Sequence, residues 1–545
     1  MYGITGIVGN NKNQVIKSIK KISGCGRIYL VQNLSADKYV ALSFNKTNRT
    51  PKPVYFFQDT QSGDFCLFYG ILYNKSTIYK LLGTCATLND AQLVMRLYKK
   101  MGSKFIKSLD GSFVIILGTK GKLSLISDYF GTKNLYYSQT SNDYFVFSSS
   151  LLSILRYVKK SKISEQALAS YLQYRFVAHP LTMFENIYKL SPKQTVQISN
   201  KAVKRHYKRD VAPSKSLKNW AQTVANCCSD KTGLLLSGGL DSSILASLTK
   251  PVKAFTISYE TRHSDMDLSC AKLVAAKFNH KHNVVKMKCR DILSALNSSI
   301  CQLEEPMYST ISASSNFLAN KAKKSVSTMI TGDGADELFI GYNYIRTALN
   351  SKNNEIEEYK KQISWCDKKI YQTLFVKNIQ QIDLIKKTNT ALDTIMNFEQ
   401  NYRLPNYHLF RLEKIMAANN IIACTPFLSE QMLNYVSAFT NKTLYTTPPK
   451  KHLSQPFANA LPMDVITRQK QPFPAPFIVW IDTSLRKDII KTFSNKKLTR
   501  KLGINCGNLL NLAHKQEKQY HDYTTIWGFY VLLKWLKRFK RYIAQ

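Results

Sequence analysis

The sequence has few acidic residues and no long apolar run. Its 35 Asp and Glu residues stand against 77 Lys and Arg, so the formal net charge is +42. Nowhere do about 18 apolar residues follow one another, which excludes a hydrophobic transmembrane helix. The first residues, MYGITGIVGNN, lack the basic region and apolar stretch of a secretory signal. We therefore expect a cytoplasmic protein without a transmembrane segment.

The cysteine pattern excludes two further classes of protein. Eleven cysteines are scattered along the chain without CxxC pairs or the spacing of a disulfide framework. This excludes a disulfide-stabilised scaffold and a zinc-finger site, and it indicates a reducing compartment. His280 and His282 flank Lys281 in a predicted turn and have no further ligands beside them. We interpret both histidines as solvated polar residues.

No internal repeat or low-complexity linker divides the chain, so changes of pattern define its domains. A length of 545 residues with 44% hydrophobic content allows more than one core. Residues 1–207 show short alternating apolar runs separated by Gly, Asn and Asp, which predicts a β-rich domain. Residues 217–545 begin with short apolar strands alternating with helical periods, which predicts a doubly wound parallel α/β domain, largely helical after residue 351. The fold class is α/β, multidomain.

The strongest motif is LLLSGGLDSS at residues 234–243, where an apolar strand runs into a helix. Glycines let backbone amides approach oxygen atoms, hydroxyl groups donate hydrogen bonds, and a helix N-terminus favours an anion. An ordinary strand-to-helix turn is the alternative, but Ser-Gly-Gly-x-Asp-Ser after an apolar run is a demanding match. We predict a nucleotide phosphate site formed by Leu236, Ser237, Gly238, Gly239, Asp241, Ser242 and Ser243.

A second loop, TGDGADELFIGY at residues 331–342, follows another apolar strand and places three carboxylates among glycines. Carboxylates repel a triphosphate unless a cation lies between them, and Mg²⁺ prefers carboxylate and phosphate oxygens. The two loops together predict ATP and Mg²⁺ as cofactors, with Asp241 and Asp336 as the metal ligands. Taken alone, this loop is equally consistent with a Gly-Asp surface turn.

The two loops, in this order, resemble the synthetase domain of the asparagine synthetase family, which also contains β-lactam synthetases and lasso-peptide cyclases. The resemblance extends over nearly the whole chain. It includes an acidic-Pro segment (Glu304, Glu305, Pro306), a later helical signature (Arg411, Leu412, Glu413, Pro426, Phe427, Leu428) and a basic, Pro-containing segment (Arg468, Lys470, Phe473, Pro476, Trp480). The resemblance implies that ATP adenylates a substrate carboxylate, that pyrophosphate leaves on Mg²⁺, and that an amine attacks the acyl-adenylate.

The resemblance also implies roles for single residues. Lys470 falls where the family places a lysine at the reacting centre, and a cation there would stabilise charge on the acyl and phosphate oxygens. A solvated lysine in a lysine-rich chain is the alternative. Asp333 and Glu337 are the other catalytic candidates, and Ile257 and Gly332 join the nucleotide-binding residues.

Residues 1–207 resemble the family's glutamine amidotransferase half, which implies an Ntn-hydrolase-like αββα fold. The matching segments are MYGITGIVG, YGILYNK, LDGSFVIIL and SDYFGTKNLYY. Glutaminase activity requires a cysteine at position 2, but the residue here is Tyr2, a phenol with an ordinary pKa of about 10 and a poor nucleophile. Tyr69 and Ile71 replace the family's Asn and Glu that would hold glutamine. We predict an inactive, structural pseudo-amidotransferase.

Without a glutaminase, the amine comes from the substrate itself, a second substrate or free ammonia. Intramolecular attack gains effective molarity worth up to about 7–11 kcal/mol, so we favour lactam or macrolactam closure of a peptide carrying Asp or Glu. A precursor peptide and a processing protease are then the expected partners. Cys424 and Ser429 stand where the family has Arg and Asp, which argues against an ordinary amino-acid pocket. Ammonia-dependent asparagine synthesis is the small-substrate alternative.

Two hypotheses from other classes remain open. A tRNA-modifying ligase would use the same loop and bind phosphates through the +42 charge, although a lysine-rich coding bias explains that charge equally well. An inactive nucleotide-binding scaffold is the other. The segment at residues 526–542 is apolar and then basic. We favour a helix that covers a domain core over one that lies on an anionic membrane.

Overall fold

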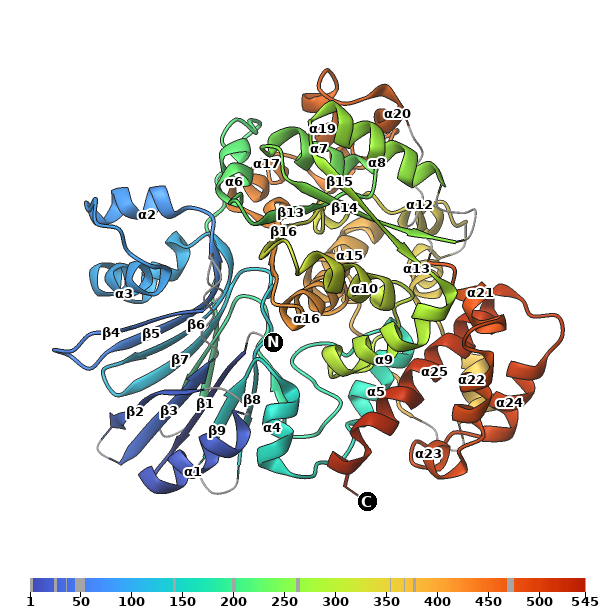
Figure 1. Cartoon of the computed structure of the whole chain (residues 1–545), viewed down its shortest axis with the longest axis horizontal. Helices are drawn as coiled ribbons and strands as arrows, with labels where there is room; N and C mark the ends of the chain where they lie inside the picture. The colour runs from blue at the N-terminus through green and yellow to red at the C-terminus, as the bar shows by residue number, and fades with distance from the viewer. Residues whose placement is uncertain are drawn as a thin grey trace.

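The computed structural model describes residues 3–23, 27–35, 37–44, 54–140, 144–198, 202–260, 265–352, 354–366, 368–375, 379–467 and 475–544. Within these ranges the first part of the chain forms two antiparallel sheets, and the second forms a parallel sheet surrounded by helices (Figure 1). The prediction of a β-rich domain followed by a parallel α/β domain is confirmed. No helix in these ranges is long and apolar enough to cross a membrane.

Each N-terminal sheet has six strands. In spatial order the first contains β10 (Tyr188–Lys189), β8 (Tyr136–Gln139), β9 (Phe145–Ser148), β1 (Ile4–Gly9), β3 (Lys38–Phe44) and β2 (Arg27–Ser35). The second contains β12 (Ala202–His206), β11 (Gln194–Ile198), β7 (Lys122–Ser127), β6 (Gly111–Thr119), β5 (Phe65–Leu72) and β4 (Val54–Gln58).

Helices cover the outer faces of both sheets, which gives the predicted αββα layers. The helices α1 (Lys12–Ile22) and α4 (Leu151–Val158) pack on the first sheet, and α2 (Lys75–Leu82) and α3 (Asp90–Met101) lie over the second (Figure 1). Strand β5 shows how the sequence dictates this. Its residues alternate, so Phe65, Leu67 and Tyr69 enter the core between the sheets, while Cys66 and Phe68 face the helices.

The second part is built on five parallel strands. Their spatial order is β15 (Lys281–Met287), β14 (Lys253–Tyr259), β13 (Thr232–Leu235), β16 (Thr328–Ile330) and β17 (Ile422–Cys424). The chain progresses outward in one direction from β13 to β15 and in the other from β16 to β17. Open α/β sheets bind ligands beyond the carboxyl ends of the strands where the order reverses, here between β13 and β16.

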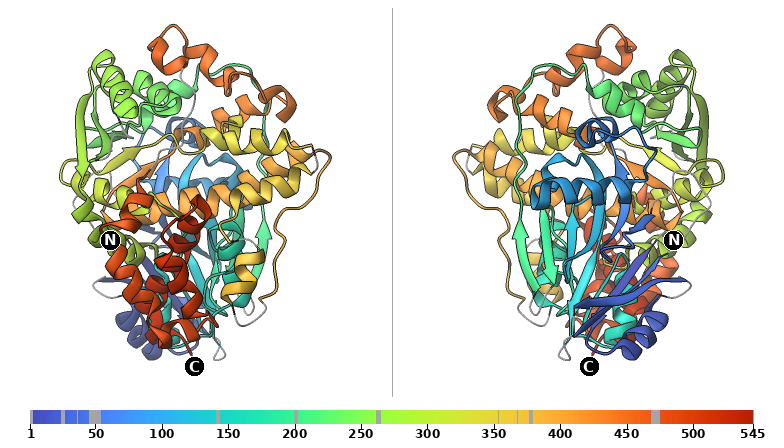
Figure 2. Two further views of the ribbon diagram at one scale, coloured as in Figure 1. Left: turned by 90° about the vertical axis from the view of Figure 1, so that its right-hand side faces the viewer. Right: turned by 90° about the vertical axis from the view of Figure 1, so that its left-hand side faces the viewer.

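Helices surround this sheet and form the C-terminal part of the chain (Figure 2). They are α5 (Glu165–Tyr174), α6 (Trp220–Asn226), α7 (Leu240–Leu248), α8 (Asp265–Lys277), α9 (Ile292–Leu303), α10 (Ser312–Ala322), α11 (Ala335–Phe339), α12 (Asn343–Leu349), α13 (Glu355–Ile363), α14 (Lys368–Leu374), α15 (Ala391–Phe398), the π-helical η4 (Glu399–Leu409), α16 (Phe410–Ala418), α17 (Glu430–Val436), α18 (Asn441–Leu444), α19 (Lys451–Ser454), α20 (Met463–Ile466), α21 (Phe477–Asp482), α22 (Arg486–Phe493), α23 (Lys496–Arg500), α24 (Cys506–His514) and α25 (Tyr520–Phe539).

Three details test the expectations for this half. The region after residue 351 is mostly helical, but β17 interrupts it and completes the sheet, a strand too short to carry a sequence pattern. The apolar residues of α25, such as Trp527 and Trp535, are fully buried, which confirms that this helix covers a core. His280 is buried, so the interpretation of a solvated residue is wrong. Its Nδ1 accepts from the Val252 amide at 3.1 Å, and its Nε2 lies 2.9 Å from the Ala246 carbonyl.

Candidate active site

The first predicted loop joins β13 to α7 at the carboxyl edge of the parallel sheet. The Oγ atoms of Ser237 and Ser242 lie 3.1 Å apart, and Ser243 Oγ donates to the Gly239 carbonyl at 2.9 Å. Gly238 has φ +75°, and a Cβ there would lie 2.4 Å from a backbone oxygen of α8, which excludes larger residues. The loop thus leads into the N-terminus of α7, where backbone amides favour an anion.

Leu236 links this loop to the neighbouring strand β14. Its amide donates to the Phe255 carbonyl at 3.0 Å, and the Thr256 hydroxyl donates to its carbonyl at 2.5 Å. Ile257 is two residues further along β14 and is buried. The structure therefore places Ile257 close to the first loop.

The second predicted loop follows β16, the strand beside β13, and the two loops touch. A Cβ on Gly332 would lie 3.1 Å from the Asp241 Cβ. Gly334, with φ +99°, precedes the short helix α11, whose first turn carries Asp336 and Glu337. The predicted phosphate loop and the predicted carboxylates thus meet where the strand order reverses.

A lysine that the sequence analysis did not single out lies between the two predicted metal ligands. The Nζ atom of Lys450 is 2.6 Å from a carboxylate oxygen of Asp241 and 2.6 Å from one of Asp336. Burial alone would lower the pKa of Lys450, but the two carboxylates more than offset this and raise it above its ordinary value. A Cβ on Gly341 would lie 2.0 Å from Asp336 Oδ1 and 2.1 Å from Lys450 Cε, so any larger residue would displace one of these two side chains.

The charges around Lys450 fit a divalent cation. Two carboxylates converge on one ammonium group, which leaves one net negative charge at the point where a cation would bind. Among the described residues, no cluster of three or more His, Cys, Asp or Glu side chains forms a metal site, so phosphate and water oxygens would complete the coordination. Asp241 and Asp336 would hold Mg²⁺, which would neutralise charge on the departing pyrophosphate.

The two predicted catalytic carboxylates have different surroundings. Glu337 is 2% exposed, accepts from the Tyr342 hydroxyl at 2.6 Å, and lies 3.5 Å from Nε2 of His408. Burial, followed by the Asp336 charge, raises the pKa of Glu337 to about 8. Burial also raises the pKa of Asp333, and the nearby charge of Arg411 offsets part of that increase. Both carboxylates thus belong to the second loop and lie in low-dielectric surroundings.

Several predicted residues lie outside the described ranges: Tyr2, Arg468, Lys470 and Phe473. Their roles stay predictions. Trp480, from the same basic, Pro-containing segment, lies on α21 and is 2% exposed. Its ring centroid is 5.8 Å from that of Tyr259, the last residue of β14, so this segment resumes close to the carboxyl edge of the sheet.

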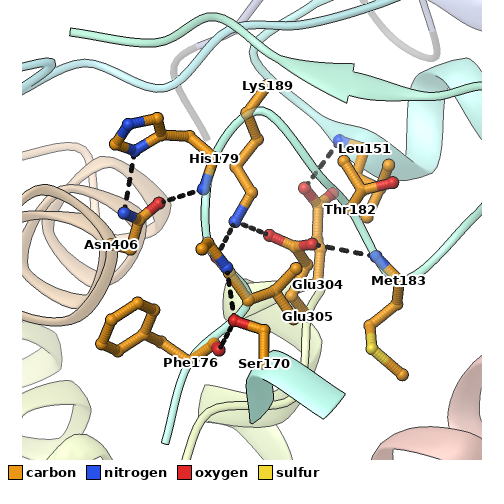
Figure 3. Close-up of polar contacts among 12 residues, drawn as sticks. Leu151, Ser170, Phe176, His179, Thr182, Met183, Lys189, Glu304, Glu305 and Asn406 are labelled. Carbon is orange, nitrogen blue, oxygen red and sulfur yellow. Dashed lines mark hydrogen bonds and ion pairs between the residues drawn. The ribbon is translucent and has the colours of Figure 1, made fainter. Parts of the chain in front are cut away.

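The acidic-Pro segment lies away from the nucleotide loops, at the interface with the N-terminal half (Figure 3). Glu305 pairs with Lys189 at 2.8 Å and accepts from the Met183 amide. Glu304 pairs with Lys414 of α16 at 2.6 Å and accepts from the Leu151 amide at 2.8 Å. All four charged side chains of these two pairs are at most 7% exposed, so these glutamates join the two halves of the chain.

A second buried cluster crosses the same interface at one of the altered amidotransferase positions. Tyr69, at 3% exposure, donates its hydroxyl to Glu413 of α16. Lys133 Nζ lies 2.5 Å from the other oxygen of that carboxylate and 5.6 Å from the Tyr69 ring centroid. Ile71, two residues along β5, is half-buried and pairs with Ser112 of β6. The Tyr69 side chain is therefore engaged with the second half of the chain.

Lys450 and His408 are the functional candidates that sequence reasoning missed. Lys450 is one of 77 basic residues, and no motif distinguishes it. His408 lies three positions before Arg411, the first residue of the helical signature, and that proximity was the available signal.

Comparison with known proteins gives two family matches. The family described as Asparagine synthase matches residues 220–537, and the Glutamine amidotransferase domain family matches residues 1–208. The glutamine-hydrolysing asparagine synthetase 1 of Bacillus subtilis is 22% identical over 500 residues, covering 77% of each chain. Asparagine synthetase B of Escherichia coli is 24% identical over 477 residues, covering 81% of this chain and 75% of the relative. A probable asparagine synthetase of Acanthamoeba polyphaga mimivirus is 23% identical over 443 residues, covering 76% and 73%.

Proposed function

The chain belongs to the asparagine synthase family as an ATP-dependent carbon–nitrogen ligase, and from this premise we propose that its amine does not come from glutamine. A substrate carboxylate is adenylated at the two loops around Lys450, and an amine then displaces AMP to form an amide. The favoured substrate is a peptide that carries both groups, so that the product is a lactam or macrolactam. ATP and Mg²⁺ are the cofactors of this proposal.

The observation that carries the proposal is the state of Tyr69. Where the family has a residue that would hold glutamine, this chain has a buried phenol whose hydroxyl donates to Glu413. Lys133 neutralises the same carboxylate from the N-terminal half. A side chain engaged in this way supplies no polar group to a glutamine molecule. The tyrosine at position 2, where the family has its nucleophile, supports the same conclusion.

Two altered positions near the second loop support a substrate larger than aspartate. Cys424 and Ser429 stand where the family has Arg and Asp, and both are fully buried. The Cys424 carbonyl accepts from the Thr331 amide at 3.0 Å, so this position adjoins the start of the second loop. A thiol and a hydroxyl there remove two charges that could bind a free amino acid. Intramolecular closure then gains the effective molarity of a tethered amine.

The test is carboxylate-dependent ATP–pyrophosphate exchange with Mg²⁺, with Asp241→Asn as the matched variant. The probes are aspartate, acidic peptides with a free N-terminus, and total tRNA at two salt concentrations. We expect exchange with an acidic peptide, lost in the variant, and no glutamate release from glutamine. Glutamate release by the purified chain would overturn the proposed amine source. Exchange that depends on tRNA and weakens with salt would reassign the substrate to nucleic acid.

Ammonia-dependent asparagine synthesis is the second candidate, favoured by the names of the relatives, which are asparagine synthetases. It is distinguished by incubating the chain with aspartate, ATP, Mg²⁺ and either ¹⁵N-ammonium or amide-¹⁵N-glutamine. Labelled asparagine from ammonium alone would establish this candidate in place of lactam closure. Labelled asparagine from glutamine would contradict both.

A further inference from the structure

Histidine 408 lies in an unusual stretch of helix next to the candidate site. The segment η4, from Glu399 to Leu409, is π-helical, and its turns close through hydrogen bonds such as that from the Phe410 amide to the Pro405 carbonyl. Such wide turns are rare and are frequently found at functional sites. Gln400 of the same segment donates to the Glu337 backbone carbonyl at 3.0 Å, which fixes η4 against α11. The π-helix therefore determines where His408 stands relative to the second loop.

Three polar side chains meet at this point. His408 Nε2 lies 3.5 Å from the Glu337 carboxylate and 3.3 Å from the Tyr342 hydroxyl, which itself donates to Glu337 at 2.6 Å. The His408 and Tyr342 rings stack with centroids 5.9 Å apart, and Tyr407 packs edge-on against His408 at 5.0 Å. The His408 side chain is 14% exposed, against 2% for Glu337. The imidazole is thus more accessible to a substrate than the Glu337 carboxyl group.

The group adjoins the part of the site where the acyl-adenylate would form. Glu337 directly follows Asp336, and Tyr342 directly follows Gly341, the glycine packed against Asp336 and Lys450. The imidazole is held on one side of the second loop by the Glu337 carboxylate, while Lys450 holds the neighbouring carboxylate of Asp336.

Amide formation needs a base at this place. When the amine nitrogen attacks the acyl carbon, a C–N bond forms, the C–O bond to AMP breaks, and the nitrogen must release a proton. A neutral imidazole nitrogen carries a lone pair and is suited to accept that proton. A lysine ammonium group, such as that of Lys450, already carries its proton and cannot act as the base.

We propose that His408 is the general base that takes the proton from the attacking amine. The proton moves from the amine nitrogen to an imidazole nitrogen, and Glu337, 3.5 Å from Nε2, holds the ring in place. Tyr342 positions the ring by stacking and by its hydrogen bond to Glu337. This assignment rests on the proposed amide-forming function and adds the residue that completes it.

The test separates adenylation from amine attack in the full chain. The variants are His408→Gln and, as a matched control, His514→Gln, which changes an exposed histidine at the end of α24. The probes are aspartate with ammonium chloride, and a linear acidic peptide with a free N-terminus. Pyrophosphate exchange measures adenylation, and amide product measures attack. Hydroxylamine, a nucleophile that is largely unprotonated at neutral pH, is added to trap the acyl-adenylate as a hydroxamate without the need for a base.

We expect His408→Gln to keep exchange within about twofold of wild type while amide formation falls about 100-fold or more. Hydroxamate formation stays near the wild-type rate, and His514→Gln matches wild type throughout. If His408→Gln folds poorly, His408→Ala is the second variant. Imidazole added to the solution is expected to replace the missing side chain and restore amide formation in His408→Ala. Wild-type amide rates in His408→Gln, or equal loss of exchange, amide and hydroxamate with no rescue by imidazole, would overturn the assignment. Absence of exchange in wild type with every probe would instead overturn the proposed function, and the assignment with it.

Discussion

The substitution Lys133→Met removes the charged partner of Glu413 at the interface between the first and second halves of the chain. The side chains of Lys133 and Glu413 are 2% and 5% exposed, so water cannot solvate the unpaired Glu413 carboxylate. Removing one member of a buried ion pair destabilises by about 3–5 kcal/mol. Tyr69→Phe removes only a hydrogen bond to the same carboxylate, which costs about 1.5–3 kcal/mol. The Lys133→Met, Glu413→Leu double variant replaces the pair by apolar side chains and is expected to recover part of the stability, since the Tyr69 hydroxyl loses its acceptor.

Urea unfolding followed by tryptophan fluorescence tests this prediction, because the tryptophans report on one half of the chain alone. All five tryptophans lie between Trp220 and Trp535, so intrinsic Trp fluorescence in a urea titration follows only the second half of the chain. Lys133 and Tyr69 lie in the first half. If the interface couples the halves, Lys133→Met lowers the fluorescence-detected midpoint more than Tyr69→Phe does. An unchanged midpoint in Lys133→Met would refute the coupling. An equal loss in the double variant would refute the electrostatic reasoning.

Three further predictions concern the site and the interface. Gly341→Ala forces a Cβ against Asp336 and Lys450, and we expect ATP–pyrophosphate exchange to fall more than tenfold while thermal unfolding changes little. Lys450→Met removes the ammonium group that pairs with both Asp241 and Asp336, and exchange is expected to fall about 100-fold or more; wild-type exchange would contradict the role of Lys450. Burial, followed by the Lys189 charge, lowers the pKa of His179 to about 4. The neutral ring therefore stabilises the fold above the unfolded pKa of about 6.5, and this contribution, up to about 3 kcal/mol, is lost as pH falls from there towards 4. His179→Gln is expected to flatten that part of the pH dependence of the urea midpoint, and an unaltered dependence would contradict it.

The fold and the first loop were predictable because their signals are local. Strand-Gly-Gly-helix and alternating apolar residues are written within ten positions of the chain and predict the β-rich half and the parallel sheet, whereas the αββα layers follow from the family resemblance. Lys450 was not predictable in this way, since it reaches Asp241 across more than two hundred residues of chain.

The errors have a physical cause of the same kind. A histidine in a predicted turn suggests solvent, but the His280 ring is buried because both of its nitrogens meet backbone groups. A π-helix has no sequence pattern that separates it from an α-helix, so the position of His408 could not be derived from spacing. In both cases the structure depends on hydrogen bonds to backbone groups that the local sequence does not specify.

The buried ion pairs of helix α16 restrict which substitutions the chain can accept during evolution. Its adjacent residues Glu413 and Lys414 are engaged separately, the first by Lys133 and the second by Glu304. Under the proposed function the first half performs no chemistry, yet its Lys133 is still under selection because it pairs with Glu413 of the second half. Substitutions at positions 2 and 71 can accumulate once glutamine is no longer used, whereas a change at position 133 must be matched at position 413. Among descendants of a common ancestor, the charges at these two positions are expected to be gained and lost together.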